Sequence, residues 1–181
     1  MHPYHAWPFE SVPNHALLSA LWEAFAHGTL CLIAVLPLVL RSRRPLVAAA
    51  AAVVGGVAID LDHAVAAGSL SLHAMETMRG RPDTHSFVVA LAAGVLVAVV
   101  TRRALFGWAV FAVYAAHLLL DAPGGGTPLL WPVADVRELP WLACPAGIVA
   151  LAVGSALAAR AHAPRARAAI ARDAGRGRVP A

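Results

Sequence analysis

The chain has 181 residues, of which 60% are hydrophobic and only 13% are charged. A water-soluble domain carries about a quarter charged residues, so an ordinary soluble globular protein is excluded. The formal net charge is +4 at pH 7, and all 14 basic residues are arginine. Because the apolar residues fall in long runs, the sequence predicts an all-α, polytopic integral-membrane helical bundle.

Five apolar segments lie between charged or Pro/Gly-rich stretches, and each is predicted to cross the bilayer. Most of them are shorter than the roughly 20 residues that a simple span needs. Polar residues at the ends of these helices are therefore expected within the membrane. The five segments are residues 24–40, 46–59, 86–101, 104–120 and 139–159.

The arginines are distributed unequally between the two sides of these spans. Eleven of them follow the first, third or fifth segment, and the other three are Arg79, Arg81 and Arg137. Since connections rich in arginine stay in the cytoplasm, the N-terminus is predicted outside and the C-terminus inside. The chain then divides into an external segment (1–23), a membrane domain (24–159) and a basic cytoplasmic tail (160–181).

The connections differ in character. Residues 14–25 carry apolar side chains at helical spacing, so they form either an interfacial helix or an outward extension of the first span. Residues 64–84 form an external connection with room for a short helix. Residues 122–138 contain three consecutive glycines between Pro123 and Pro128, which predicts an irregular loop and a candidate lid.

Ionisable residues gather at one depth in four different spans. A rise of about 1.5 Å per residue from each cytoplasmic helix end puts His27, Asp60, His85 and His117 at ~20 to 22 Å. An unpaired charge at such a depth costs roughly 2.5 to 3.5 kcal/mol even on a mild insertion scale. The coincidence therefore favours a functional cluster over unrelated polar contacts between helices.

The local spacings suit a metal site. His117 and Asp121 are i and i+4, and Asp60 and His63 are i and i+3, so each pair shares a helical face. Asp62 points elsewhere in a regular helix, and it joins only if the helix ends there or if it faces a second ion or a neighbouring histidine. Imidazoles and carboxylates without thiolates favour zinc, with manganese and iron as alternatives, in one or two ions.

Two further residues extend this set at the start of the first span. His15 lies about three turns before His27, and the depth argument selects His27 as the early ligand. Glu23 is four residues before His27, which suits either a partner of that histidine, a general base or a solvated helix face.

Four motifs follow one another in a characteristic order. They are Asp60-Leu-Asp-His63, Thr84-His85-Ser86, His117-xxx-Asp121 and the loop Gly126-Thr-Pro-Leu-Leu-Trp-Pro132. This order closely resembles the YdjM-type family of membrane-bound, metal-dependent hydrolases. The family pattern has an early histidine, a DxDH motif, a THS motif after a basic turn, and HxxxD followed by a loop that ends in LLWP. The match covers about residues 27–132.

The resemblance implies a hydrolase of the bacterial inner membrane with kinship to helical zinc-dependent phospholipase C and nuclease folds. One departure concerns the usual His-Arg-Gly-x-Thr-His-Ser, since this chain reads Gly80-Arg-Pro-Asp-Thr-His-Ser86. Either Asp83 substitutes for the missing histidine, or one ion site is weakened, or this chain is less active than its relatives. By position, the implied metal ligands are His27, Asp60, Asp62, His63, His85, His117 and Asp121.

The expected activity is hydrolysis of a phosphoester in a lipid-like substrate by a metal-activated water. Asp62 or Glu23 would take the proton, and Arg79 or Arg81 would steer an anionic headgroup. The alternatives are a metal-ion or proton conductor and a metal-stabilised scaffold without turnover. The expected partners are the lipid bilayer and this substrate, with no nucleic acid; the oligomeric state stays open.

Overall fold

The computed structural model describes residues 15–71, 74–75, 80–124 and 126–176. Apart from one isolated β-bridge between Leu130 and Ala134, the regular structure in this part of the chain is helical. The all-α prediction is confirmed. The helices are α1 (His15–Val39), α2 (Pro45–Ala58), α3 (Leu61–Ala67), α5 (Phe87–Thr101), α6 (Ala104–Asp121), the short 3-10 helix η2 (Ala122–Gly124) and α7 (Ala143–Arg176).

Four helical stretches are long and apolar enough to cross a membrane, and α5 is a shorter apolar helix. The second stretch includes α3 as well as α2, so it is longer than the apolar run 46–59 on which the prediction rested. The multi-pass membrane protein inferred from composition is confirmed. The four stretches are Leu17–Val39, Pro45–Ala67, Ala104–Asp121 and Ala143–His162.

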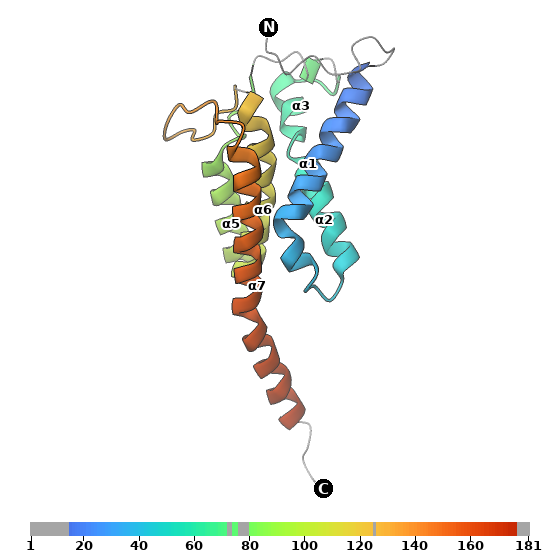
Figure 1. Cartoon of the computed structure of the whole chain (residues 1–181), viewed down its shortest axis with the longest axis vertical. Helices are drawn as coiled ribbons and strands as arrows, with labels where there is room; N and C mark the ends of the chain where they lie inside the picture. The colour runs from blue at the N-terminus through green and yellow to red at the C-terminus, as the bar shows by residue number, and fades with distance from the viewer. Residues whose placement is uncertain (1–14, 72–73, 76–79, 125, 177–181) are drawn as a thin grey trace.

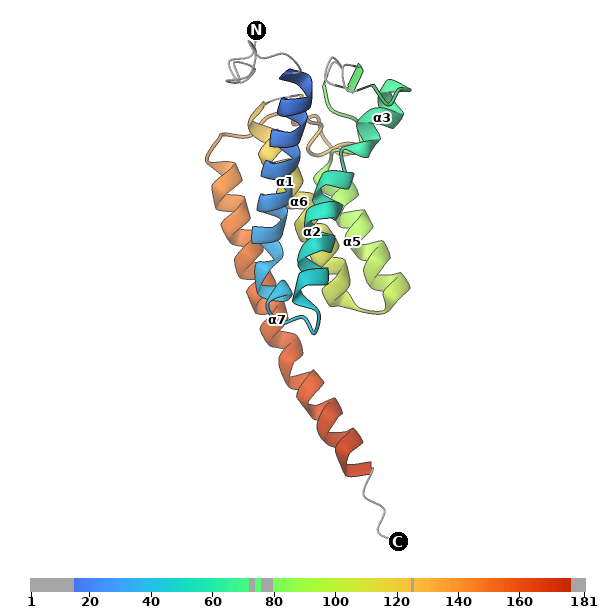
Figure 2. The same cartoon turned by 90° about the vertical axis from the view of Figure 1, so that its right-hand side faces the viewer.

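The long helices lie side by side in a bundle, with α6 at its centre (Figures 1 and 2). Helix α6 contacts α1, α2, α5 and α7. Its buried face carries small residues, among which Ala112 and Ala116 are fully buried. Small side chains let neighbouring helices approach closely where lipid tails provide no hydrophobic drive for association. Side chains at one end of α6 are therefore within reach of several other helices.

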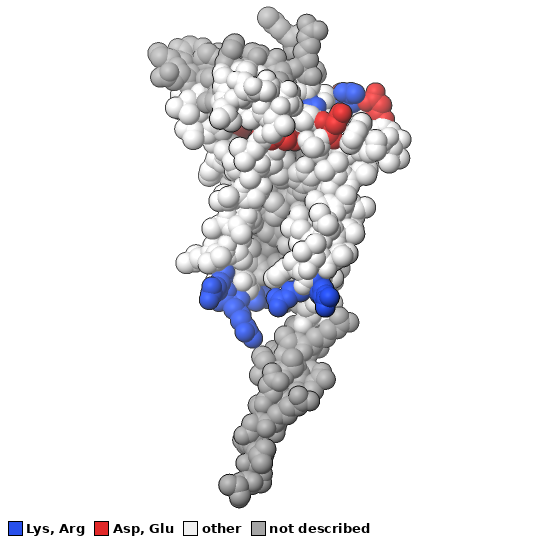
Figure 3. Space-filling model, turned by 180° about the vertical axis from the view of Figure 1, so that it is seen from behind, with Lys and Arg blue, Asp and Glu red and all other residues white. Residues whose placement is uncertain are grey.

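Charged residues gather at the two ends of the bundle, with arginines at both ends and the visible carboxylates at one of them (Figure 3). The arginines of the turn after α1 and of the turn between α5 and α6 lie at one end, which we call the arginine end. The carboxylates lie at the other end, and an uncharged band separates the two. This distribution is typical of a membrane protein, and the positive-inside rule predicts that the arginine end faces the cytoplasm.

The structure resolves how the ends of two segments are built. Helix α1 is continuous from His15, so the apolar residues before position 25 extend the first span and do not form a separate interfacial helix. The helix at residues 46–59 ends at Ala58, and α3 begins at Leu61. The DxDH motif consequently lies at a break between two helices. Helix α3 reaches only Ala67 in the connection 64–84, and Gly68, with a left-handed φ of 60°, ends it. Part of that connection, residues 72–73 and 76–79, lies outside the described residues.

The last helix differs from the predicted segment 139–159 at both ends. It begins at Ala143, after a turn in which the Ala143 N–H donates to Pro140 O. Pro145 falls in the first helical turn, where its missing N–H removes no helical hydrogen bond. The helix continues to Arg176 because the residues after 160 are mainly alanine and arginine, which are strong helix formers. The tail up to this residue is therefore helical.

Candidate metal centre

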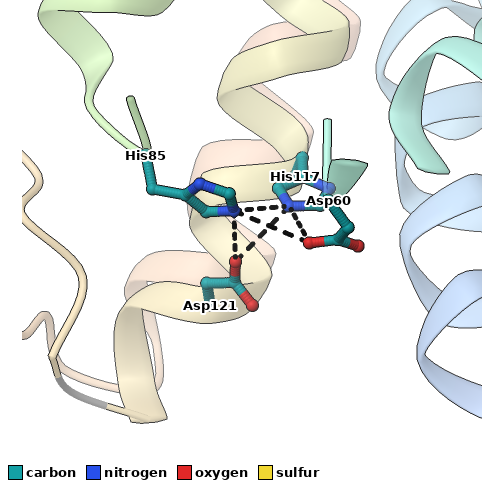
Figure 4. A group of neighbouring side chains, drawn as sticks. All are labelled: Asp60, His85, His117 and Asp121. Atoms are coloured by element: carbon teal, nitrogen blue, oxygen red, sulfur yellow. Dashed lines mark hydrogen bonds and ion pairs between the residues drawn. The ribbon is translucent and has the colours of Figure 1, made fainter. Parts of the chain in front are cut away.

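Four ionisable side chains converge at the end of the bundle opposite the arginine end. His117 and Asp121 lie on α6, Asp60 lies at the break between α2 and α3, and His85 precedes α5. One ligand atom from each of the four lies within 4.8 Å of all the others. We call these residues the four-ligand cluster (Figure 4).

The distances within the four-ligand cluster match those between ligands of one ion. His117 Nε2 lies 3.3 Å from Asp60 Oδ1 and 3.4 Å from Asp121 Oδ2. His85 Nε2 lies 3.6 Å and 3.5 Å from the same two oxygens, and the two Nε2 atoms are 3.3 Å apart. Ligands at about 2.0 to 2.1 Å from a tetrahedral ion are about 3.3 Å from one another. The cluster therefore has the size of a four-coordinate transition-metal site.

Hydrogen bonds on the far side of each imidazole fix the direction of its free lone pair. His117 Nδ1 donates to the carbonyl oxygen of Gly56 at 2.8 Å, and His85 Nδ1 donates to Asp62 Oδ2 at 2.9 Å. With the protons on Nδ1, both Nε2 atoms present lone pairs to the cluster. Outer hydrogen bonds of this kind orient the histidines of metal sites.

One oxygen of each carboxylate in the cluster has no hydrogen-bond donor among the described residues. Asp60 Oδ1 and Asp121 Oδ2 are buried and accept no hydrogen bond from the residues that the structure describes. His85 and His117 are fully buried, whereas the Asp60 side chain is 32% exposed. Several buried acceptors with no donor between them are costly unless a cation satisfies them. The residues present thus fit a divalent ion, which would be reached from the Asp60 side.

The electrostatics of His85 support the same conclusion. Burial lowers the pKa of His85, but the neighbouring carboxylates of Asp60 and Asp62 raise it by more, so that its pKa lies above the usual 6.5. The carboxylates thus make this corner of the site favourable for positive charge.

Two more of the predicted ligands lie beside the four-ligand cluster. The His27 ring stacks on His117 with centroids 4.0 Å apart, and its Nε2 lies 3.3 Å from Asp121 Oδ1. His63 Nδ1 lies 3.0 Å from Asp62 Oδ1. Asp62, His63 and His85 form a second group whose ligand atoms lie within 4.8 Å of one another. The structure therefore brings all seven predicted ligands to one end of the bundle, with four of them around one point.

The break between α2 and α3 explains the position of Asp62. In a regular helix this carboxylate would point away from Asp60 and His63, but α3 starts anew at Leu61. Asp62 Oδ2 instead accepts hydrogen bonds from His85 Nδ1 and from the Thr84 hydroxyl. Of the alternatives that the sequence left open, the structure shows the one in which Asp62 faces a neighbouring histidine.

The two arginines and the remaining acidic candidates are placed as follows. Arg81 is turned into the site, where its guanidinium donates to Asp121 Oδ1 at 2.8 Å and to His63 Nε2 at 3.0 Å. Asp83 is exposed and has no hydrogen bond or ion pair among the described residues. The Glu23 carboxylate likewise forms no hydrogen bond in the described part of the chain. Arg79 lies outside the described residues, and of His15 only the backbone is described.

Several supporting residues were missed by the sequence reasoning. Gly56 contributes the carbonyl that fixes His117, and a Cβ at this position would lie 2.6 Å from the sulfur of Cys31. Tyr114 donates its hydroxyl to the Thr84 carbonyl at 2.9 Å. The sequence feature that could have identified Tyr114 is its position about one turn before His117 on the same helix. No sequence signal pointed to Gly56, because it acts through its backbone carbonyl, which every residue type has.

The loop after α6 is hydrogen-bonded to the start of α5. The Phe87 N–H donates to Leu129 O at 2.9 Å, and the Ser86 hydroxyl donates to Trp131 O at 2.7 Å. Ser86 also caps α5 by accepting from the Val88 N–H. Since His85 directly precedes this cap, the loop positions it. The THS and LLWP motifs are therefore in direct contact in the structure.

Comparison with known proteins gives one match. A family model described as YdjM inner membrane protein matches residues 23–172. No curated protein and no solved structure matches the chain. The matched residues include α6, the break between α2 and α3, and the whole four-ligand cluster. The chain therefore belongs to the YdjM inner membrane protein family, as its motifs and multi-pass architecture indicated.

Proposed function

We propose that this protein is a membrane-embedded, metal-dependent hydrolase that cleaves a phosphoester in a lipid-like substrate. The observation that carries the proposal is the four-ligand cluster, in which two imidazole lone pairs and two unpartnered carboxylate oxygens face one point. Zinc suits this donor set and spacing best, and manganese and iron are the alternatives.

The residues of the cluster would hold the ion. A bound divalent ion supplies a water of lowered pKa and polarises a phosphoryl oxygen. Asp60, the most exposed of the four, borders the side from which substrate would arrive. Gly56 and Asp62 hold His117 and His85 in the orientation that directs Nε2 inward.

The proton acceptor is proposed among two carboxylates. Asp62 Oδ2 is committed to His85 and Thr84, but Asp62 Oδ1 accepts no hydrogen bond among the described residues. That oxygen lies 3.0 Å from His63 Nδ1, and it is the Asp62 oxygen that we propose as the proton acceptor. Glu23, whose carboxylate also forms no hydrogen bond in the described part of the chain, is the second candidate.

An anionic substrate would meet Arg81 beside the cluster. Its side chain is 30% exposed, and two of its five N–H donors reach Asp121 and His63. Its other donors have no acceptor among the described residues and would be available for phosphoryl oxygens, and Arg79 is proposed to assist from the preceding residues. A guanidinium suits this role because its planar donors match phosphate geometry.

The interior of the bundle favours hydrolysis over conduction. Between the four-ligand cluster and the arginine end, the buried residues of the described helices are apolar except for Ser155. Ser155 is occupied by hydrogen bonds with Trp108 and Ala34. A conductor would need polar groups that continue across the membrane, so a site open on one side fits better.

A pair of variants tests catalysis separately from metal binding. In Asp62→Asn the amide keeps the shape and an acceptor oxygen for His85, so we expect most of the metal to remain and turnover to fall by about 100-fold or more. In His85→Ala both metal and turnover should be lost, because a ligand is removed. Asp135→Asn, an exposed carboxylate paired with Arg137, is the control and should leave both unchanged.

The measurement combines metal analysis of detergent-purified protein with release of product from phospholipids and polyprenyl phosphates. Zinc- or manganese-loaded protein that releases nothing from such a panel, while proteoliposomes pass ions, would overturn the hydrolase and favour a conductor. Metal-loaded protein that neither hydrolyses nor conducts would favour a scaffold.

A further inference from the structure

The second group of close ligand atoms, from Asp62, His63 and His85, lies directly beside the four-ligand cluster. To hold an ion, each member of this group would have to present a lone pair to the others. A neutral imidazole has a lone pair on only one of its two ring nitrogens, and the other nitrogen carries a proton. The positions of the protons on His63 and His85 therefore decide whether this group can bind a metal.

His85 uses its one lone pair outside the second group. Its Nε2 faces the ligand atoms of the four-ligand cluster (Figure 4). Its Nδ1 lies 2.9 Å from Asp62 Oδ2, and so short a contact with a carboxylate oxygen requires a proton on the nitrogen. His85 therefore presents an N–H group to Asp62, and not a lone pair.

The proton of His63 is placed by Arg81. The Arg81 Nη1 atom lies 3.0 Å from His63 Nε2. Because a guanidinium has only N–H donors and stays protonated in proteins, Nε2 has to be the acceptor and carry the lone pair. The ring proton of His63 is then on Nδ1, the nitrogen that faces Asp62.

Arg81 is held in this position at both its side chain and its backbone. The guanidinium also donates to Asp121 Oδ1 at 2.8 Å. The backbone N–H donates to Gly126 O at 3.2 Å, in the loop after α6. The contact with His63 is therefore made by a side chain that two further hydrogen bonds orient.

The surroundings of His63 Nδ1 favour a proton on this atom. It lies 3.0 Å from Asp62 Oδ1 and 3.7 Å from Asp60 Oδ1, and the side chain is only 7% exposed. His63 Nδ1 and Asp62 Oδ1 are buried and lack an aligned hydrogen-bond partner among the described residues, but their separation is that of a hydrogen bond. An ion between them would need the lone pair of His63 on Nδ1, and the contact with Arg81 places it on Nε2.

We propose that His63 is a positioning residue and not a metal ligand. Arg81 keeps the lone pair of His63 on Nε2, and the Nδ1–H of His63 donates to Asp62, which in turn orients the ligand His85. The second group then holds no ion of its own, and His63 departs from the ligand role that the family resemblance implied.

This role is compatible with the proton acceptor of the proposed function, on whose metal centre the inference rests. Each oxygen of a carboxylate has about two lone-pair sites. A hydrogen bond from His63 therefore leaves one site on Asp62 Oδ1 for the proton that Asp62 is proposed to accept.

The same substitution at two histidines tests the inference. Asparagine places an N–H donor near the position of histidine Nδ1 and has nothing in place of Nε2. His63→Asn should therefore bind zinc with an affinity close to that of the wild type. His117→Asn keeps a donor for the carbonyl of Gly56 but loses the ligating Nε2, so zinc binding should weaken by more than about 100-fold. His63→Ala, which removes the donor, should weaken zinc binding by about 10- to 100-fold.

The measurements use full-length, detergent-purified protein. Competition with a chelator gives the zinc affinity, and X-ray absorption gives the number of imidazoles bound per zinc, which should be the same in wild type and His63→Asn. Gel filtration and circular dichroism identify any variant that fails to fold. Wild-type protein labelled with nitrogen-15 histidine provides a check without a variant, because the magnetic resonance signal of His63 Nδ1 should stay that of a protonated nitrogen after zinc is added.

The outcomes separate this inference from the metal centre itself. Loss of one imidazole per zinc in His63→Asn, or a zinc-bound Nδ1 of His63 in the labelled protein, would make His63 a ligand and overturn the inference. Equal zinc affinities of His63→Ala and wild type would overturn the positioning role and leave the metal centre intact. Wild-type protein that binds no zinc would overturn the metal centre and this inference with it.

Discussion

The middle of the bundle and the end with the four-ligand cluster bury different kinds of residues. In the middle, the fully buried residues are small, such as Ala34, Ala112 and Ala116, and one polar chain runs from Trp108 Nε1 through Ser155 Oγ to Ala34 O. At the cluster end, the buried residues include four histidines and Asp121. One region consists of close contacts between small residues, and the other gathers imidazoles and carboxylates that could hold a metal ion.

From this difference we expect membrane insertion and the proposed metal binding to depend on separate residues. Apolar spans insert because the bilayer accepts them and because a helix satisfies its own backbone. Their association then depends on close packing of small residues. The polar end contributes the proposed ligands, and we expect their loss to leave these contacts in place. Each of the following predictions addresses one of the two regions or their relation to the membrane.

The largest expected effect concerns the two sides of the membrane. In a variant with Cys31 and Cys144 replaced by alanine, a thiol at Ser42 should react only with reagents applied from the cytoplasm. A thiol at Asp135, near the cluster end, should react only from outside, because the arginine end is predicted to be cytoplasmic. The measurement is labelling of intact cells with a membrane-impermeant maleimide. The reverse pattern would show that the cluster faces the cytoplasm.

Removal of one ligand should abolish metal binding and spare the helices. Loss of an outer hydrogen-bond partner of a ligand typically weakens metal affinity by about 10- to 100-fold. We expect His117→Ala and Asp60→Ala, which each remove a proposed ligand itself, to weaken zinc binding by more than this. Membrane fractionation should show both variants inserted. Ser155→Ala, the matched change in the middle of the bundle, should keep its metal. Full occupancy in both ligand variants would remove the metal-site hypothesis.

A glycine between two helices should matter for packing. A Cβ at Gly94 of α5 would lie 2.8 Å from the carbonyl oxygen of Gly107 on α6, so Gly94→Ala forces the two backbones apart. We expect a loss of about 1 to 3 kcal/mol in stability, measured by unfolding in detergent. At Gly55 a Cβ would meet only a Val113 methyl at 3.9 Å, and Gly55→Ala should therefore be neutral. Equal effects of the two would contradict the packing argument.

The smallest effect is expected from the polar chain in the middle. Trp108→Phe removes the 3.0 Å hydrogen bond to Ser155, while Ser155 keeps its 2.8 Å bond to Ala34 O. The expected cost is about 0.5 to 1.5 kcal/mol, with metal content unchanged. Trp141→Phe, at an exposed tryptophan, serves as the control in the same unfolding measurement. Loss of metal from Trp108→Phe would show that the two regions are coupled.

The sequence determined the membrane architecture and the residues that meet in it. Apolar runs, arginine-rich connections and i, i+4 spacing are local properties, so the spans and the pairing of His117 with Asp121 could be inferred without a fold. The depth argument used a local property of the same kind, because the rise of a helix converts residue number into height. Helix ends were less certain, as the start of α3 at Leu61, within the DxDH motif, and the extension of α7 to Arg176 demonstrate.

The tertiary structure alone decided which atom of each side chain faces which neighbour. The His117 tautomer depends on the carbonyl of Gly56, 61 residues away, and the orientation of Asp62 depends on a break between two helices. Arg81 was expected at the rim, but it turns inward because Asp121 and His63 offer acceptors that are distant in sequence. Spacing along one helix specifies a shared face and a depth, whereas contacts between helices depend on their mutual packing, which no local pattern encodes.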